Sequence, residues 1–173
     1  MTTPFVIELK LADEGDALAI TELLNASYRS GNGWTHEKQL VAGSRAQEAA
    51  IREIIATQLG VYLLLFNAQQ LLACIHIEPF ADGAMIGSFA VRPDWQGAGI
   101  GAGVLKAGEE YAMDHFAAAA LYMDVLAPRK ELIAYYERKG YCLTGEQKDF
   151  PLEVGAGTPF DAKLKVVRLV KRV

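Results

Sequence analysis

The 173-residue sequence has few of the residues that mark special architectures. Its two cysteines, Cys74 and Cys142, and its three histidines show no metal-ligand spacing. Because two cysteines cannot build a disulfide framework, we expect both to be small core residues in a reducing compartment. No stretch approaches roughly 18 consecutive apolar residues, and the first residues lack a basic segment followed by a long apolar run. The sequence therefore predicts no membrane span and a cytoplasmic location.

Basic residues are also scarce. The 17 Lys and Arg are outnumbered by 21 Asp and Glu, which gives a formal charge of −4 and argues against a nucleic-acid partner. A chain that is 51% apolar and 22% charged has ordinary globular composition, and 173 residues suffice for one core. Without repeats or linkers, residues 1–173 are predicted to form a single domain that needs no metal.

Glycine, in contrast, is concentrated in one stretch, FAVRPDWQGAGIGAGVL at positions 89–105. An apolar strand ends at Pro93, four glycines follow within positions 97–103, and helical spacing then resumes. Glycine lets a ligand approach the main chain, and a helix N-terminus offers unpaired N–H groups and a positive dipole end. This combination favours a phosphate site. The alternative, a plain strand-to-helix turn, leaves unexplained four glycines that each weaken a helix start by up to about 1 kcal/mol.

Two common phosphate motifs fit this stretch poorly. Gly97, Gly99 and Ala102 match G-x-G-x-x-A, the dinucleotide fingerprint, only weakly. That motif expects a strand running directly into the first glycine and an acidic residue about 20 positions later, whereas Asp124 lies 27 positions after Gly97. No Gly-Lys-Ser/Thr is present, which excludes a nucleoside-triphosphate P-loop.

A third motif fits better. VRP at 91–93, then QGAGIG at 96–101 and a helix, resembles the pyrophosphate-binding segment of the GNAT superfamily of acyl-CoA-dependent N-acyltransferases. YERKGY at 136–141 resembles the family's Tyr-x-x-x-Gly-Phe/Tyr, in the expected order. The resemblance implies acetyl-CoA as co-substrate, an amine acceptor and an α+β fold with a mixed, mostly antiparallel twisted sheet flanked by helices.

The rest of the chain agrees with that fold, in the order βααβββαβαββ. Strands are expected at Phe5–Lys10, Val61–Phe66, Leu71–Ile77, Ala84–Val91, Ala119–Leu126, Tyr141–Thr144 and Lys165–Lys171, and helices from Asp13, from Ser44, at Gly99–Asp114 and after Pro128. Three consecutive strands joined by short turns should be antiparallel, which a doubly wound dinucleotide fold would not show. On the third helix, Glu109 is expected to face outward. A homodimer is expected from the habit of the resembled family and from the C-terminal strand as an open edge, although the Lys and Arg residues of that strand can equally block pairing.

Acyl transfer from a thioester to an amine requires deprotonation of the amine, stabilisation of the carbonyl oxygen and protonation of the departing thiolate. No Cys/His/Asp arrangement indicates a covalent intermediate, so direct attack in a ternary complex is the simpler mechanism. Tyr136 is the candidate general acid, because a neutral phenol with a pKa of about 10 can protonate a thiolate, and its position matches the family's tyrosine. The alternative is an aromatic core residue packed on Leu132, one helical turn away. Tyr135 is expected to point about 100° away from Tyr136 around the same helix, which makes it the less suitable proton donor.

The base is less well defined. His76 and Glu78 lie on one face of a strand, and either side chain can accept a proton from an amine directly or through water. A hydrogen-bonded sheet histidine and an exposed strand-end carboxylate are the structural alternatives. Glu37 is a third candidate, and the resemblance does not choose among them because the family uses varied bases.

The remaining site residues are cofactor and acceptor contacts. The main-chain N–H groups predicted to hold the pyrophosphate are those of Gln96, Gly97, Ala98, Gly99, Ile100, Gly101 and Ala102. The resemblance implies that Phe89 and Val91 pair with the pantetheine arm, and that the loop with Trp34 and Glu37 lines the acceptor side. For Trp34 the alternative is a surface loop folded onto the core. Arg129 stands where the family often has Asn, and it can meet a phosphate instead.

The sequence therefore predicts an N-acetyltransferase acting on a small-molecule or peptide amine. A non-catalytic acyl-CoA-binding regulatory module is the main alternative. A nicotinamide-dependent oxidoreductase is disfavoured by the antiparallel strands.

Overall fold

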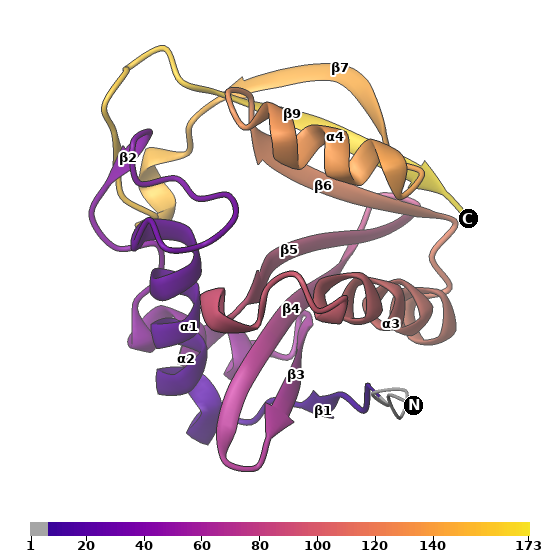
Figure 1. Ribbon diagram of the computed structural model, residues 1–173. Helices are drawn as coiled ribbons and strands as arrows, with labels where there is room; N and C mark the ends of the chain where they lie inside the picture. The colour runs from indigo at the N-terminus through magenta and orange to yellow at the C-terminus, as the bar shows by residue number, and fades with distance from the viewer. Residues whose placement is uncertain (1–6) are drawn as a thin grey trace.

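The computed structural model describes residues 7–173, which form a seven-stranded sheet covered by helices on both faces (Figure 1). The strand order is β1-β3-β4-β5-β6-β9-β7, with bounds Lys10–Leu11 (β1), Val61–Asn67 (β3), Gln70–Phe80 (β4), Gly83–Val91 (β5), Ala120–Leu126 (β6), Lys165–Arg172 (β9) and Cys142–Asp149 (β7). A second, two-stranded sheet pairs Val41–Ala42 (β2) with Thr158–Pro159 (β8). The α-helices of this part of the chain are Ala17–Arg29 (α1), Glu48–Thr57 (α2), Ile100–Phe116 (α3) and Lys130–Arg138 (α4).

The sheet is mostly antiparallel, as predicted, and its one parallel pair within residues 7–173 is short. β5 and β6 pair only at Ala84 with Leu121 and at Met85 with Tyr122. Beyond Met85 the two strands diverge, and Figure 1 shows the gap between them widening toward α1. Within residues 7–173, the edge of β5 from Ile86 to Val91 therefore has no strand neighbour on the β6 side.

A β-bulge at Ser88 changes the direction of β5 beside this gap. Ser88 has a φ of +43°, and the β4–β5 register shifts between Cys74 and His76. The Cys74 thiol donates to the Ser88 carbonyl oxygen (3.3 Å), which holds the bulge against β4. After the bulge, Phe89 and Val91 pack with the core beneath α3. Bulges commonly lie beside functional sites, because they redirect side chains and interrupt strand pairing.

Two apolar cores fill the two faces of the sheet. Helices α1 and α2 cover one face through residues such as Ile20, Leu24 and Ile51. Helices α3 and α4 cover the other, where Val104 and Ile133 join the largest cluster of buried side chains. The predicted helices and long strands are therefore present, with shifted ends.

Tertiary contacts correct three expectations. Glu109 is buried rather than outward, because it accepts a hydrogen bond from the Tyr141 hydroxyl (2.8 Å) and pairs with Lys171 (2.9 Å). The strand Lys165–Arg172 is internal, since it pairs with β6 and β7, so the edge argument for a homodimer does not apply to it. Cys142 is exposed on the edge strand β7, whereas Cys74 is buried as expected.

Two predicted element starts are also wrong. Ser44 does not begin α2, which starts after Gln47; instead the Asn25 side-chain oxygen accepts the backbone N–H groups of Arg45 (2.7 Å) and Ala46 (3.1 Å). Of the strand predicted at Phe5–Lys10, residues 7–9 are not in a strand, and β1 begins at Lys10. Residues 5 and 6 of that prediction lie outside the described part of the chain.

Candidate active site

Two adjoining cavities open where β5 and β6 separate. The larger, about 730 Å³, lies along the end of β5 and the glycine loop, and the smaller, about 230 Å³, lies toward β6 and the loop after β7. The residues that line both are Tyr28, Phe89, Arg129, Leu132 and Tyr136. These five side chains mark the junction through which bound molecules in the two cavities can meet.

The glycine loop offers open backbone to the larger cavity. Gly97 and Gly99 have φ values of +85° and +79°, and a Cβ added at either would meet no atom within 4 Å. Gly99 is the N-cap of α3, and no side chain of residues 7–173 caps this helix, so the first N–H groups of a 17-residue helix are available. This geometry suits an anion such as a diphosphate. Of the predicted loop contacts, Gln96, Gly97, Gly99, Gly101 and Ala102 line the cavity, and Ala98 and Ile100 do not.

The end of β5 lines both cavities, but its carbonyl oxygens already have partners. The Val91 oxygen accepts from the Ser27 hydroxyl and the Gln96 side-chain amide, each at 3.0 Å. The Phe89 oxygen accepts from the Tyr28 hydroxyl, also at 3.0 Å. A pantetheine arm lying here would therefore meet a strand edge whose Phe89 and Val91 carbonyl oxygens already accept hydrogen bonds from α1 and from Gln96.

Tyr136 lies at the junction of the cavities with 6% of its surface exposed. Burial raises its pKa well above the ordinary value of 10, so the phenol stays neutral and retains the proton it would donate. Tyr135 also lines the larger cavity, where its ring meets Trp34 edge-on at 5.9 Å. The expectation that Tyr136 rather than its neighbour Tyr135 is the proton donor remains a prediction.

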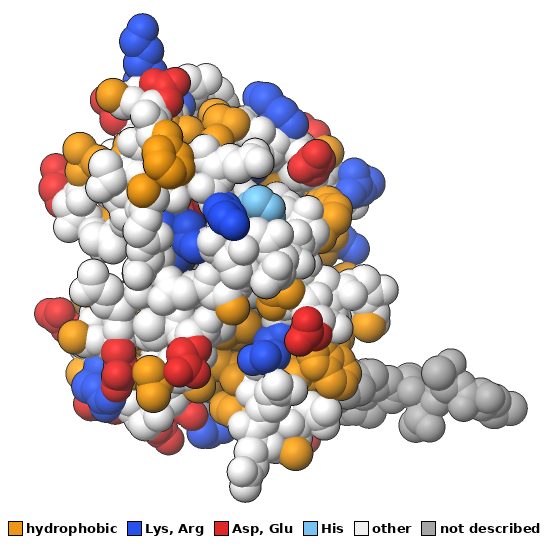
Figure 2. All heavy atoms as spheres, turned by 60° about the vertical axis from the view of Figure 1, so that its left-hand side comes forward, with side chains coloured by type: hydrophobic (Ala, Val, Ile, Leu, Met, Phe, Trp, Pro, Cys, Tyr) orange, Lys and Arg blue, Asp and Glu red, His pale blue; other side chains and the backbone are white. Residues whose placement is uncertain are grey.

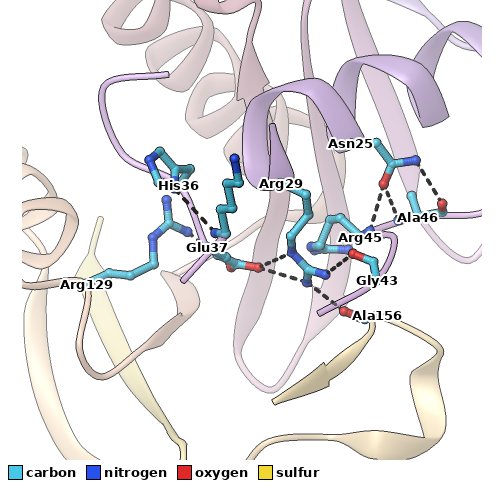
Figure 3. Close-up of polar contacts among 10 residues, drawn as sticks. Asn25, Arg29, His36, Glu37, Gly43, Arg45, Ala46, Arg129 and Ala156 are labelled. Atoms are coloured by element: carbon cyan, nitrogen blue, oxygen red, sulfur yellow. Dashed lines mark hydrogen bonds and ion pairs between the residues drawn. The ribbon is translucent and has the colours of Figure 1, made fainter. Parts of the chain in front are cut away.

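Glu37 is buried in an ion-pair network beside the smaller cavity (Figure 3). One carboxylate oxygen pairs with Arg29 (3.0 Å) and the other with Arg129 (3.2 Å), and all three side chains are only 7–8% exposed. Arg29 also donates to the carbonyls of Gly43 and Ala156, which ties α1 to two loops. Both oxygens of Glu37 are thus in use, so its geometry fits a positioning role better than that of a base.

Arg129 directs its guanidinium toward this network. Besides Glu37, it contacts the Thr35 hydroxyl (3.4 Å) and lies 5.5 Å from the centre of the Tyr28 ring. Its predicted phosphate contact remains a prediction, since the contacts seen are to the junction of the cavities.

Asp124, on β6, is the second carboxylate of the smaller cavity. It accepts two hydrogen bonds from Arg168 (2.9 and 3.1 Å) and one from Lys148 (2.8 Å). Burial alone would raise the pKa of Asp124, but these hydrogen bonds outweigh burial and hold the pKa below its usual range. Asp124 is therefore an ionised and fully engaged carboxylate.

His76 and Glu78 line neither cavity. The His76 ring lies 4.6 Å from that of Tyr62, its Nε2 has no hydrogen-bond partner within residues 7–173, and burial lowers its pKa to about 4. Glu78 stands near the end of β4, opposite Met85. The structure therefore does not bring these two predicted bases together with Tyr136.

Two further observations concern function classes. Residues 7–173 contain no cluster of three or more side chains able to ligate a metal. Over the same range, no helix combines the length and apolar character that crossing a bilayer requires.

A family model and several solved structures match this chain. The sequence profile of the Acetyltransferase (GNAT) family matches residues 18–141. Similar solved structures include the ribosomal-protein-S18-alanine N-acetyltransferase of Escherichia coli (16% identity, TM-score 0.67, covering 97% of this chain and 94% of that one). Another is the ribosomal-protein-alanine N-acetyltransferase of Brucella melitensis (16% identity, TM-score 0.71, covering 96% of this chain and 100% of that one). A third is a variant of the Vibrio cholerae spermidine N-acetyltransferase (14% identity, TM-score 0.69, covering 96% of this chain and 95% of that one). No curated protein matches the chain by sequence.

Proposed function

Because the chain belongs to the GNAT acetyltransferase family, we propose that it transfers an acetyl group from acetyl-CoA to a primary amine by direct attack in a ternary complex. The observation that carries this proposal is the position of Tyr136, whose side chain lines both the larger and the smaller cavity. A proton donor at that junction can reach a leaving group from one cavity while a nucleophile approaches from the other.

The larger cavity is proposed to bind the acyl donor. The open backbone at Gly97 and Gly99 and the start of α3 would hold the diphosphate. The edge of β5 that has no neighbouring strand within residues 7–173 would lie along the pantetheine arm. Acetyl-CoA supplies the activated thioester carbonyl. Backbone N–H groups on the free edge of β5 are the nearest candidates for stabilising charge on that carbonyl oxygen.

The smaller cavity is proposed to bind the acceptor amine. Its two carboxylates, Glu37 and Asp124, are each bound by two basic side chains, so neither is a free base. Positive charges nearby disfavour the ammonium form of a bound amine and lower its pKa. The amine can then lose its proton to water, and no dedicated side-chain base is needed.

In the proposed reaction, the amine nitrogen attacks the thioester carbonyl carbon and the carbon–sulfur bond breaks. Tyr136 donates its proton to the departing sulfur, which leaves as the CoA thiol, and regains a proton from water. The nitrogen releases its extra proton to water, which gives a neutral amide. Burial keeps the phenol neutral, so Tyr136 carries the proton that this step uses.

Tyr136→Phe tests the proposal. With an acceptor found by screening amines for CoA thiol release, kcat should fall by roughly 10²–10⁴-fold while acetyl-CoA affinity and melting temperature hold. Tyr111→Phe is the matched control, since Tyr111 stacks on His115 of α3 and lines neither cavity. An unchanged kcat with a lowered melting temperature would return Tyr136 to a purely structural role. Acetyl-CoA binding without turnover of any amine would favour a non-catalytic acyl-CoA-binding module.

A further inference from the structure

Arg45 is a charged residue of the smaller cavity that the reaction above does not use. It precedes α2, is half-buried, and has its guanidinium carbon 5.0 Å from the centre of the Tyr28 ring. Its backbone N–H is fixed by the Asn25 side chain at 2.7 Å, and its side chain extends beside Arg29 (Figure 3). The arginine is thus positioned by α1 rather than by an ion pair.

The charges around the smaller cavity are unequal. Its lining includes four basic side chains, Arg29, Arg45, Arg129 and Lys148, against two acidic ones, Glu37 and Asp124. Arg29 and Arg129 pair with Glu37, and Lys148 pairs with Asp124. Figure 2 shows Lys and Arg side chains near the middle of one face of the molecule.

Arg45 is the exception in this set. No carboxylate within residues 7–173 lies within ion-pairing distance of its guanidinium. Taking a charge out of water without a partner is unfavourable, and the planar guanidinium matches a carboxylate with two parallel hydrogen bonds. An anion that enters the cavity would form an ion pair with Arg45, as Glu37 does with Arg29.

We propose that the acceptor is a small amine carrying a carboxylate, which Arg45 binds while the amine faces Tyr136. This inference rests on the proposed acetyl transfer. A cavity of about 230 Å³ falls below the about 300–1,000 Å³ usual for drug-sized ligands, so it suits a molecule the size of a free amino acid. A polyamine, by contrast, would place further positive charge beside a wall that has no free carboxylate within residues 7–173.

The test compares matched acceptors with acetyl-CoA as donor and thiol release as readout. The set comprises free α-amino acids, their amides, the corresponding decarboxylated amines, spermidine, and an amidated tripeptide with an aspartate at its second position. Free amino acids should show a kcat/KM at least about 10-fold above their amides and amines, the value expected for one charge-assisted pair. Comparison with the tripeptide shows whether the carboxylate of a peptide side chain is used as well as that of a free amino acid.

Arg45→Met keeps an apolar side chain over Tyr28 and removes the charge. It should raise KM for carboxylate acceptors by about 10- to 100-fold, leave KM for their amides unchanged, and leave acetyl-CoA affinity intact by calorimetry. Arg45→Lys should recover part of the loss, and Arg52→Met, an exposed arginine on α2, is the control. Equal use of amides, or preference for spermidine, overturns the acceptor inference while acetyl transfer stands. Failure of the parent protein to bind acetyl-CoA overturns both.

Discussion

The backbone N–H of Trp34 donates a 2.6 Å hydrogen bond to the side-chain oxygen of Gln96, and the same side chain donates to the Val91 carbonyl at 3.0 Å. One amide thereby joins the loop between α1 and β2, the start of the glycine loop and the end of β5. These three segments line the larger cavity, so its shape depends on Gln96.

Gln96→Ala should therefore weaken acetyl-CoA binding without unfolding the protein. Losing two neutral hydrogen bonds that position the cavity wall, each worth about 1 kcal/mol, should raise the Kd by up to about 30-fold. Calorimetric titration measures this change, and Gln69→Ala, at the exposed β3–β4 turn, is the control. An unaltered Kd would show that Trp34 and its loop do not shape the donor site.

Gly99→Asp should abolish acetyl-CoA binding. The new carboxylate would lie at the start of α3 against the proposed diphosphate, and like charges placed together cost several kcal/mol, so affinity should fall by about 100-fold or more. The positive φ adds a backbone cost of about 1–3 kcal/mol in stability.

Gly145→Asp is the matched control for that variant. Gly145 has a φ of +87° and equally open space around its Cβ position, but it lies on β7 and lines neither cavity. It should show the backbone cost in thermal unfolding and keep the parent's affinity. If Gly99→Asp binds acetyl-CoA within a factor of about two of Gly145→Asp, the loop is not the phosphate site.

Glu37→Gln should destabilise the fold strongly. It removes the charge that Arg29 and Arg129 share, and leaving buried cations uncompensated costs about 3–5 kcal/mol. Urea unfolding should report this loss, whereas Glu48→Gln, which breaks the exposed pair with Arg52, should cost at most about 1 kcal/mol. Equal effects of the two changes would contradict the network's proposed positioning role.

His76 should make the protein acid-sensitive. Its pKa is about 4 when folded, against about 6.5 when unfolded, because burial disfavours the imidazolium. Between these values the unfolded chain binds more protons, so stability should fall by up to about 3 kcal/mol as the pH drops from 6.5 to 4.

The His76→Phe variant isolates that effect, because phenylalanine keeps the ring packed on Tyr62 and removes the unpaired Nε2. Urea midpoints measured from pH 7 to pH 4 should fall less steeply in this variant than in the parent. His115→Gln, at an exposed position on α3, is the control. Parallel curves for the parent and His76→Phe would rule out His76 as the cause.

Much of the fold could be predicted from local signals. Alternating and continuous apolar runs placed the long strands, and the short turns between Val61 and Val91 predicted that β3, β4 and β5 are antiparallel. The predicted helix after the glycine loop is present, and it begins at Ile100, one residue after the predicted start at Gly99. These features are decided by residues close together in the sequence, so periodicity and composition reveal them.

The tertiary structure decided which charged side chains are buried and which residues line the cavities, because both depend on partners distant in the sequence. Glu109 is polar and was expected outside, but a tyrosine and a lysine more than thirty residues away bind it inside the core. Arg29, Arg45 and Asp124 carry no local signal for a cavity, and the divergence of β5 from β6 brings them to one. The sequence by itself determined the elements and the glycine loop, because short-range sterics and hydrophobic periodicity act locally. The pairing of charges and the meeting of two cavities at Tyr136 were decided only by packing, since burial and electrostatic complementarity depend on contacts across the whole fold.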